Sequence, residues 1–332
     1  MSKFIIKRFL GLLVTILGLS ILMFILSRLM PGDAIRYALG PNATEAQVLQ
    51  MEEQLGLNLS YPQQYWNYLT GFLTGDMGMS LRTNRNVALD IIDTFPATFE
   101  LAIIATILSV VIGIPLGILS ATHYNQLPDF LIRIFSMTGI AIPEFFLAIV
   151  LQIIFGYMLG WLPIIGRGPG PETTVTGLFL LDSLITLDWE ALWISFKHII
   201  LPSITLAIAP MAQIMRMTRN NMLSRKNKDY ILAARAYGLP KDIVENRYLL
   251  KNSITSLLTI IGMQFGSLIG NAFLVETVFS WPGMAQYSIN GLVANDYNSI
   301  ISVTLIVGIM FALVNLIVDI MYGYFDPRIK VG

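Results

Sequence analysis

The stretch that decides the fold is TFELAIIATILSVVIGIPLGILS, residues 98–120, in which Glu100 is the one ionisable side chain. A helix needs about 20 apolar residues to cross roughly 30 Å of hydrocarbon, because each residue adds about 1.5 Å. The whole chain has a matching composition, with 55% apolar and 13% charged residues, whereas a soluble domain has about 25% charged residues. The sequence therefore predicts an all-α integral membrane protein.

Further apolar runs of similar length lie along the chain, at residues 9–29, 134–159, 199–217, 254–275 and 300–322. We therefore predict about six transmembrane helices. The first run follows basic residues, as a signal peptide would, but it leads into Arg28-Leu-Met-Pro31 rather than a small-residue cleavage site, so we expect it to be retained. The predicted organisation is a first span within residues 1–30, an extracytoplasmic segment over 31–97 and a core domain over 98–332.

Lysine and arginine are unevenly distributed about these spans. With six spans, one side of the membrane carries fifteen of the 21 basic residues and the other carries only Arg28, Arg36, Arg82, Arg85, Arg167 and Lys197. Because basic residues accumulate in cytoplasmic loops, this partition predicts that both termini lie in the cytoplasm.

Two segments are predicted to lie outside. In the first, Thr44-Glu-Ala-Gln47 has the pattern of a capping box that opens a helix through Leu55, and residues 61–68 are rich in Tyr and Trp, which favour the headgroup level. The second runs from residue 160 to 197. Both are candidate surfaces for an extracytoplasmic partner, although ordinary packed loops would look the same.

The largest cytoplasmic loop contains DYILAARAYGLP, residues 229–240. Asp229 is predicted to cap the amino end of a short helix, and Gly238 to take the left-handed conformation that ends it. Leu239 would supply the accompanying apolar contact, and Pro240 would begin a second helix. The small side chains of Ala233 and Ala234 would let another protein approach this helix closely.

The same loop resembles the EAA loop of ABC importer permeases, whose pattern is Glu-Ala-Ala, three residues, then Gly. This chain has Leu232-Ala233-Ala234, three residues, then Gly238, and departs from the pattern in Leu232, where an acid is expected. The elements Asp229-Tyr230, Ala234-Arg235-Ala236 and Gly238-Leu239 resemble the peptide branch of that family in order, with one extra residue before Ala-Arg-Ala.

Short strings along the rest of the chain are similar to the first permease subunit of dipeptide/oligopeptide importers. They are Arg28-Leu-Met-Pro-Gly-Asp33, Gly75-Asp-Met-Gly-Met-Ser80, Ile142-Pro-Glu-Phe145, Leu201-Pro202, Val275-Glu-Thr-Val-Phe279, Trp281-Pro-Gly283 and Asp326-Pro-Arg328. Each string is weak alone, but their order and spacing extend over nearly all of the 332 residues.

This resemblance implies the fold of a type I ABC importer permease, multi-pass in the cytoplasmic (inner) cell membrane, with residues 98–332 as the core permease domain and 218–253 as its coupling loop. It implies half of a pathway for di- or oligopeptides. Implied partners are a second homologous permease, two ATP-binding subunits and an extracytoplasmic solute-binding protein. The residues implied to bear on the ATPase are Asp229, Tyr230, Ala233, Ala234, Arg235, Ala236, Gly238 and Leu239. A solvated helix-turn-helix remains the alternative reading of this loop.

The chain lacks the sequence features of an ATPase. A phosphate-binding loop ends in Gly-Lys-Ser/Thr, and no Lys in this sequence follows a Gly. We therefore expect a transport subunit that is not itself an enzyme and binds no cofactor, with ATP and Mg²⁺ on the partner ATPase. With no Cys, two His and zero formal net charge, neither a metal site nor a nucleic-acid partner is expected.

Polar residues within the spans are the candidates for the transport path. Gln264, Ser267 and Asn271 would be costly facing lipid and are expected to face protein or water. Glu144 follows Pro143 in the third predicted span, and Glu276 is expected at the outer mouth, where a peptide amino group would arrive. These five polar side chains form the candidate path set: Glu144, Gln264, Ser267, Asn271 and Glu276.

Other ionisable and small residues in the spans favour structural roles. We expect Glu100 to complement the dipole of its helix and Asp319 to pair with Asn315 or Arg328. Gly262, Gly266 and Gly270 share one helical face, as do Gly113 and Gly117 on another helix, which favours close helix packing over a pore lining.

Other substrates and other classes of protein stay open at this point. The same importer class carries oligosaccharides and nickel chelates as well as peptides. A secondary transporter would be expected to have an inverted repeat, which is not detectable here. A membrane hydrolase would need a motif such as His-Glu-x-x-His or Gly-x-Ser-x-Gly, and neither is present.

Overall fold

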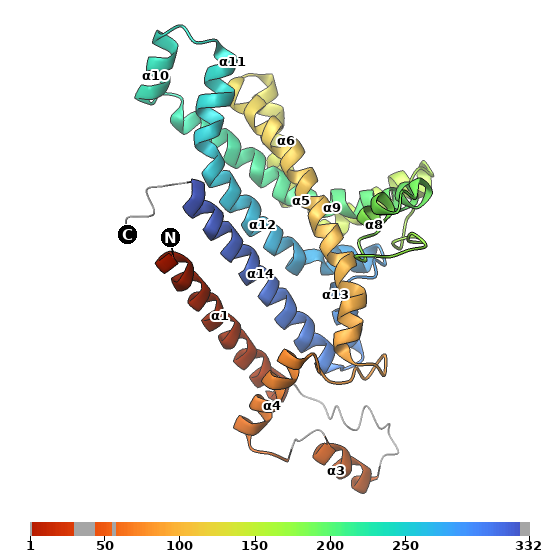
Figure 1. Cartoon of the computed structure of the whole chain (residues 1–332). Helices are drawn as coiled ribbons and strands as arrows, with labels where there is room; N and C mark the ends of the chain where they lie inside the picture. The colour runs from red at the N-terminus through yellow and green to blue at the C-terminus, as the bar shows by residue number, and fades with distance from the viewer. Residues whose placement is uncertain (1, 30–43, 55–57, 326–332) are drawn as a thin grey trace.

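The computed structural model describes residues 2–29, 44–54 and 58–325, which are almost entirely helical (Figure 1). The long helices are α1 (Ser2–Leu29), α5 (Val87–Thr122), α9 (Trp189–Arg225), α12 (Lys251–Val278) and α14 (Tyr297–Phe325). The shorter ones are α3 (Glu45–Gln54), α4 (Tyr61–Thr74), α6 (Leu127–Ala141), α7 (Glu144–Leu151), α8 (Phe179–Ile185), α10 (Asp229–Ala236), α11 (Lys241–Ile243) and α13 (Met284–Val293). Two π-helical segments, η1 (Gln152–Met158) and η2 (Val244–Leu250), follow α7 and α11.

The predicted count of about six spans is confirmed. Among the described residues, five helices are long and apolar enough to cross a membrane, at residues 6–26, 87–122, 189–225, 256–278 and 297–321. A sixth span is formed only if α6 and the α7–η1 helix count as one, and these two are bent by 105° at residues 142–143.

That bend corrects the straight third span predicted over residues 134–159. Pro143 has no N–H to donate to the preceding turn, and its ring disfavours the helical conformation at the residue before it. Ile142 accordingly takes an extended conformation, with φ −74° and ψ 124°, and ends α6. The apolar run is therefore continuous in sequence but broken in space.

Helices α5 and α9 are longer than their predicted spans, with 36 and 37 residues. Each begins at a capping side chain well before the apolar run, because Asn86 accepts the N–H of Ala88 and Asp188 accepts that of Ala191. At about 1.5 Å per residue both exceed 50 Å, more than the roughly 30 Å of hydrocarbon. Hydropathy detected only the apolar middle of each helix.

Glycines set the closest approaches between the long helices. A Cβ added to Gly117 of α5 would lie 2.6 Å from the Cβ of Thr218 in α9, and one on Gly266 of α12 would lie 2.6 Å from the ring of Phe311 in α14. A Cβ added to Gly262 would likewise clash with the side chain of Val318 in α14. The predicted packing role is confirmed at these glycines, and it holds helices of this chain together.

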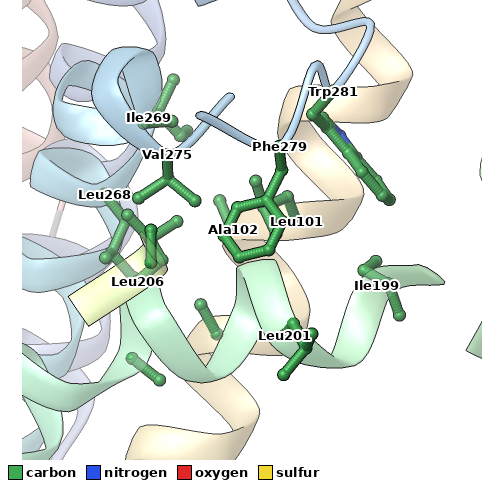
Figure 2. Close-up of a cluster of buried hydrophobic side chains, with 14 of the residues drawn as sticks. Leu101, Ala102, Ile199, Leu201, Leu206, Leu268, Ile269, Val275, Phe279 and Trp281 are labelled. Carbon is green, nitrogen blue, oxygen red and sulfur yellow. The ribbon is translucent and has the colours of Figure 1, made fainter. Parts of the chain in front are cut away.

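The main core lies where α5, α9 and α12 meet. Figure 2 shows side chains from these helices gathered around Phe279 and Trp281, which belong to the segment after α12. The indole N–H of Trp281 donates to the backbone oxygen of Ala97 at 3.0 Å, so the buried ring has a hydrogen-bond partner. This core ties the end of α12 to the first half of α5.

Helix α1 lies outside this core, alongside α14 (Figure 1). Its carboxyl end carries α4, because Ser20 hydrogen-bonds the Tyr65 hydroxyl at 2.8 Å and the ring of Phe24 packs edge-on against Tyr65. The predicted helix after Thr44 is confirmed as α3, with the Gln47 side chain accepting the N–H of Thr44. Its predicted end at Leu55 lies outside the described residues.

Candidate functional site: the α10 hairpin and the polar residues of α12

Helix α10 and the turn after it form a short hairpin between α9 and α12, near the top of Figure 1. Gly238 has φ +72°, and the N–H of Leu239 donates to the oxygen of Ala234 at 3.2 Å. This is the glycine-terminated helix end that the sequence predicted. At the other end the expectation was wrong by one residue, because Lys228 occupies the cap position and Asp229 is the first helical residue, where its charge complements the helix dipole.

The inner face of α10 is apolar and buried. Ile231 and Ala234 pack with Met222 of α9 and with Val244 and Leu249 of η2. Ala234 is only 5% exposed, so it does not belong to the accessible surface on which the sequence analysis placed it together with Ala233. Its small size serves contact with this chain. The cluster also includes Ala121, so α10 belongs to one apolar cluster with the ends of two long helices, α5 and α9, and with η2.

The outer face of α10 carries large exposed side chains. Tyr237 is 87% exposed and Leu232 49%, and Tyr230 is exposed beside them. Ala233, Arg235, Ala236 and Gly238 complete this exposed set. Aromatic and aliphatic side chains gathered on one rigid protrusion mark a protein contact more often than a solvated helix.

The three polar candidates on α12 have different surroundings. Gln264 donates from its amide to the side-chain oxygen of Gln213 at 2.5 Å and so links α12 to α9. Ser267 donates to the backbone oxygen of Met263 in its own helix at 3.0 Å. Asn271 is exposed, next to the exposed Gly270. Asn271 therefore offers the most accessible polar group on this part of α12.

Glu276 does not lie at an open mouth. Its carboxylate is fully buried, accepts the hydroxyl of Thr98 at 2.6 Å and accepts the N–H of Gln286 at 2.9 Å. Thr98 in turn accepts the N–H of Met284 at 2.8 Å. The expected position at an accessible outer mouth is corrected: Glu276 joins α12, α5 and the amino end of α13, where a carboxylate suits the helix dipole.

Glu100 also differs from its expected role in the helix dipole of α5. Its carboxylate pairs with the Arg167 guanidinium at 2.5 Å and accepts the N–H of Leu180 at 2.7 Å. The guanidinium lies 3.6 Å from the ring centroid of Phe179 and donates to the oxygen of Gly177. Burial lowers the pKa of Arg167, and the charge of Glu100 opposes that shift. Sequence reasoning missed this pair, because its members are far apart in the chain.

Two further carboxylates lie in the spans. Asp319 of α14 pairs with Arg8 of α1 at 3.0 Å, so the expected pairing with Asn315 was wrong. The other expected partner, Arg328, lies outside the described residues. Glu144 is the first residue of α7, directly after the bend, and is partly buried. It makes no hydrogen bond or ion pair with any other described residue, and its charge complements the dipole of α7.

Comparison with known proteins identifies relatives along the whole chain. The family described as "Binding-protein-dependent transport system inner membrane component" matches residues 113–331, and the corresponding amino-terminal family matches residues 1–102. The dipeptide transport system permease protein DppB of Alkalihalophilus pseudofirmus is 40% identical over 99% of this chain and 100% of its own length.

Other relatives are similar over comparable lengths. The probable D,D-dipeptide transport system permease protein DdpB of Escherichia coli is 39% identical, covering 97% of this chain and 96% of the relative. The glutathione transport system permease protein GsiC of Salmonella typhimurium is 34% identical over 99% of both chains. A chain of the MetNI methionine ABC transporter in an inward-facing conformation aligns with a TM-score of 0.54 at 16% identity, covering 72% of this chain and 97% of that one.

Proposed function

Because this chain belongs to the family of binding-protein-dependent transport system inner membrane components and is a permease subunit of an ABC importer, we propose that it imports short peptides and is driven through α10. The proposal includes a second, homologous permease that completes the pathway, two ATP-binding subunits and an extracytoplasmic solute-binding protein. In this arrangement α10 lies in the cytoplasm, as do both termini, and the membrane is the cytoplasmic one.

The observation that carries the coupling role is the construction of the α10 hairpin. Its outer face exposes Tyr237 and Leu232, and its inner face packs on residues from α9, η2 and the end of α5. A force applied to the outer face would reach the ends of α5 and α9 through packed side chains, because packed interiors have low compressibility. η2 continues directly into α12, so the hairpin is also covalently joined to the helix that carries the path candidates.

The path is assigned to the exposed polar part of α12 around Asn271, with Ser267 one turn away. An asparagine facing lipid would be costly, so a water-filled path or a second permease is the better neighbour. Gln264 faces α9 and Glu276 is buried, so both are assigned to holding helices together. Glu144 stays a path candidate because it is partly buried with no partner among the described residues.

Peptides are favoured as substrates because three similar permeases are named for dipeptides, D,D-dipeptides and glutathione. A pathway with few fixed charges suits peptides of varied side chain, because each fixed charge would select against part of them. Oligosaccharides and nickel chelates remain the alternatives within the same importer class.

Reconstitution tests this function. The chain would be co-expressed with the permease, ATPase and binding-protein genes next to its own, purified and placed in liposomes with ATP inside. We expect uptake of a labelled dipeptide that requires both ATP and the binding protein. An Asn271→Leu variant is expected to insert normally but to transport the dipeptide more slowly. A matched Thr277→Val variant, changed at an exposed polar site on the same helix, is the control.

Different failures have different meanings. If no ATPase copurifies, or if uptake follows an ion gradient without ATP, the coupling proposal is wrong and a secondary transporter gains support. If ATP-dependent uptake is found for an oligosaccharide or a nickel chelate and not for dipeptides, only the substrate assignment fails.

A further inference from the structure

A cavity of about 200 Å³ lies between α6 and α9, close to the end of the molecule that carries α10. Three arginines, Arg133, Arg216 and Arg219, line one part of it. Ile132, Met137 and Ile140 line another part. The cavity thus combines guanidinium groups with an apolar wall.

The carboxylate of Asp129 beside this cavity is already saturated. Arg219 donates to both of its oxygens, at 2.7 and 2.9 Å, in a bidentate pair. Ser120 donates its hydroxyl to Oδ1 at 2.6 Å, and Asn125 donates its N–H to Oδ2 at 3.0 Å. Four hydrogen bonds occupy the acceptor sites of a carboxylate, so Asp129 neutralises Arg219 and has no site left for a second guanidinium.

The other two arginines lack such an acceptor. The Nε of Arg133 lies 3.8 Å from Asp129 Oδ1, too far for a hydrogen bond, and this nitrogen is buried without a hydrogen-bond partner among the described residues. Arg216 is exposed and forms no hydrogen bond or ion pair with another described residue. Arg133 and Arg219 thus share the single negative charge of Asp129, and the three arginines keep a net charge of about +2. One of their donors, the Nε of Arg133, is buried without an acceptor among the described residues, which is unfavourable.

The depth of these arginines matches that of lipid headgroups. Arg133 directly precedes the apolar run 134–159, and Arg216 lies at the end of the apolar run 199–217. Basic residues at the ends of apolar segments lie at the membrane–water boundary. On the hydrocarbon side of Arg133, Met137 is 70% exposed and Ile140 is exposed as well. Met137 lies about one helical turn after Arg133, and Ile140 lies about one turn after Met137.

We propose that this cavity is a binding site for an anionic phospholipid. The phosphate group is held by Arg133 and Arg216, whose planar guanidinium groups match phosphate oxygens in a bidentate manner. One acyl chain lies along Met137 and Ile140. A net negative headgroup is required because the two arginines are not neutralised by the protein, and a zwitterionic headgroup would compensate only part of their charge.

The test uses the full chain purified in detergent and examined by native mass spectrometry after addition of phosphatidylglycerol or phosphatidylcholine. We expect wild type to retain phosphatidylglycerol more tightly than phosphatidylcholine, and the double variant Arg133→Gln/Arg216→Gln to lose about tenfold or more of that affinity, as expected for two charges near a membrane surface. The matched control Lys226→Gln/Lys228→Gln removes the same charge from the loop after α9 and leaves retention unchanged.

Three results would overturn the site. Wild type could retain the two lipids equally, the Arg133/Arg216 variant could retain phosphatidylglycerol as tightly as wild type does, or the Lys226/Lys228 control could lose affinity for phosphatidylglycerol. A fourth arm adds inorganic phosphate to lipid-free protein. If phosphate alone stabilises wild type against heat as strongly as the lipid does, the site takes a free anion and the lipid assignment is wrong.

If the double variant does not insert into the membrane, the proposal can still be tested on the wild-type protein. Phosphatidylglycerol with a photoactivatable acyl chain is expected to label the peptide that contains Met137 and Ile140. Labelling spread evenly over the exposed faces of α1 and α14, with no preference for α6, would contradict the proposal.

Discussion

The Glu276 end of the α5–α12 helix pair and the α10 hairpin are held in place by different chemistry. At the Glu276 end, buried carboxylates meet specific donors: Glu276 joins Thr98 and the amino end of α13, and Glu100 pairs with Arg167. The α10 hairpin packs against neighbouring helices through apolar side chains such as Ile231 and Ala234, and a glycine turn ends its helix. The carboxylate of Asp129 lies nearby, but its bonds join α6 to α5 and α9 rather than to α10. Buried polar bonds are directional and costly to break, whereas apolar contacts are not directional.

This difference indicates that the α10 hairpin is the part expected to move and the Glu276 end the part expected to stay fixed. A network of buried, saturated carboxylates admits one arrangement, because any displacement leaves a buried charge unpaired. Apolar side chains can slide and repack at lower cost. A chain that receives force at α10 and keeps the Glu276 end fixed would convert that force into relative movement of its long helices.

The largest effect is expected from breaking the Glu100–Arg167 pair. Arg167→Ala leaves the Glu100 carboxylate buried without its cation and should destabilise the fold by about 3–5 kcal/mol. Thermal unfolding in detergent, followed by circular dichroism, measures this. In the matched double variant Glu100→Gln/Arg167→Met no charge stays buried, so much of the stability should return. If the single and double variants unfold together, the pair is not the main element that holds this end.

The next effect distinguishes the two faces of α10. Ala234→Leu adds three carbons to a filled cluster and should cost about 1–3 kcal/mol. Ala233→Leu makes the same change on the exposed face and should leave the unfolding temperature unchanged while weakening copurification of the ATPase. Equal unfolding temperatures for the two variants would contradict the division of α10 into an inner and an outer face.

A smaller effect on stability is expected at Gly238. Its φ of +72° costs a non-glycine residue about 1–2 kcal/mol, and no atom lies within 4 Å of an added Cβ, so the strain comes from the backbone alone. Gly238→Val should insert normally and hydrolyse ATP with its partners, yet take up little substrate. Gly238→Asn, which tolerates this conformation better, should retain more uptake. Normal uptake by the Val variant would argue strongly against coupling through this turn.

The smallest effect is expected at the pair of Lys241 in α11 and Glu245 in η2, directly after the α10 hairpin, whose charged groups are 3.7 Å apart and of which Lys241 is exposed. Lys241→Ala should change stability by about 0.2–0.5 kcal/mol, because water and salt screen exposed pairs. The same unfolding experiment at low and high salt measures it. A loss as large as that of Arg167→Ala would show that the α10 hairpin, too, depends on ion pairs.

Local features of the chain were predictable because they depend on neighbouring residues. The apolar runs indicated the spans, and Gly238 followed by Leu239 and Pro240 indicated a helix end with its left-handed residue. Pro143 was visible as an irregularity, yet its effect on direction was not, since a proline can kink a helix or end it. The ends of α5 and α9 were missed because their polar turns lie outside the apolar runs.

The roles of the carboxylates could not be read in the same way. Glu100, Glu276 and Asp319 are each bonded to a residue far away in the sequence. Hydropathy and periodicity describe a residue and its near neighbours, and they do not say which distant side chain arrives beside it. For this reason Glu276 was expected at an outer mouth as a path candidate, although the fold buries it completely.

The sequence by itself determined that this protein is a bundle of membrane-spanning helices with a capped hairpin between two of them, because length, hydropathy and turn chemistry are local properties. Only the tertiary structure decided which face of α10 is buried, which carboxylates are paired and that the Nε of Arg133 beside Asp129 lacks a hydrogen-bond acceptor among the described residues. The physical reason is that burial and pairing depend on how helices far apart in the chain pack together.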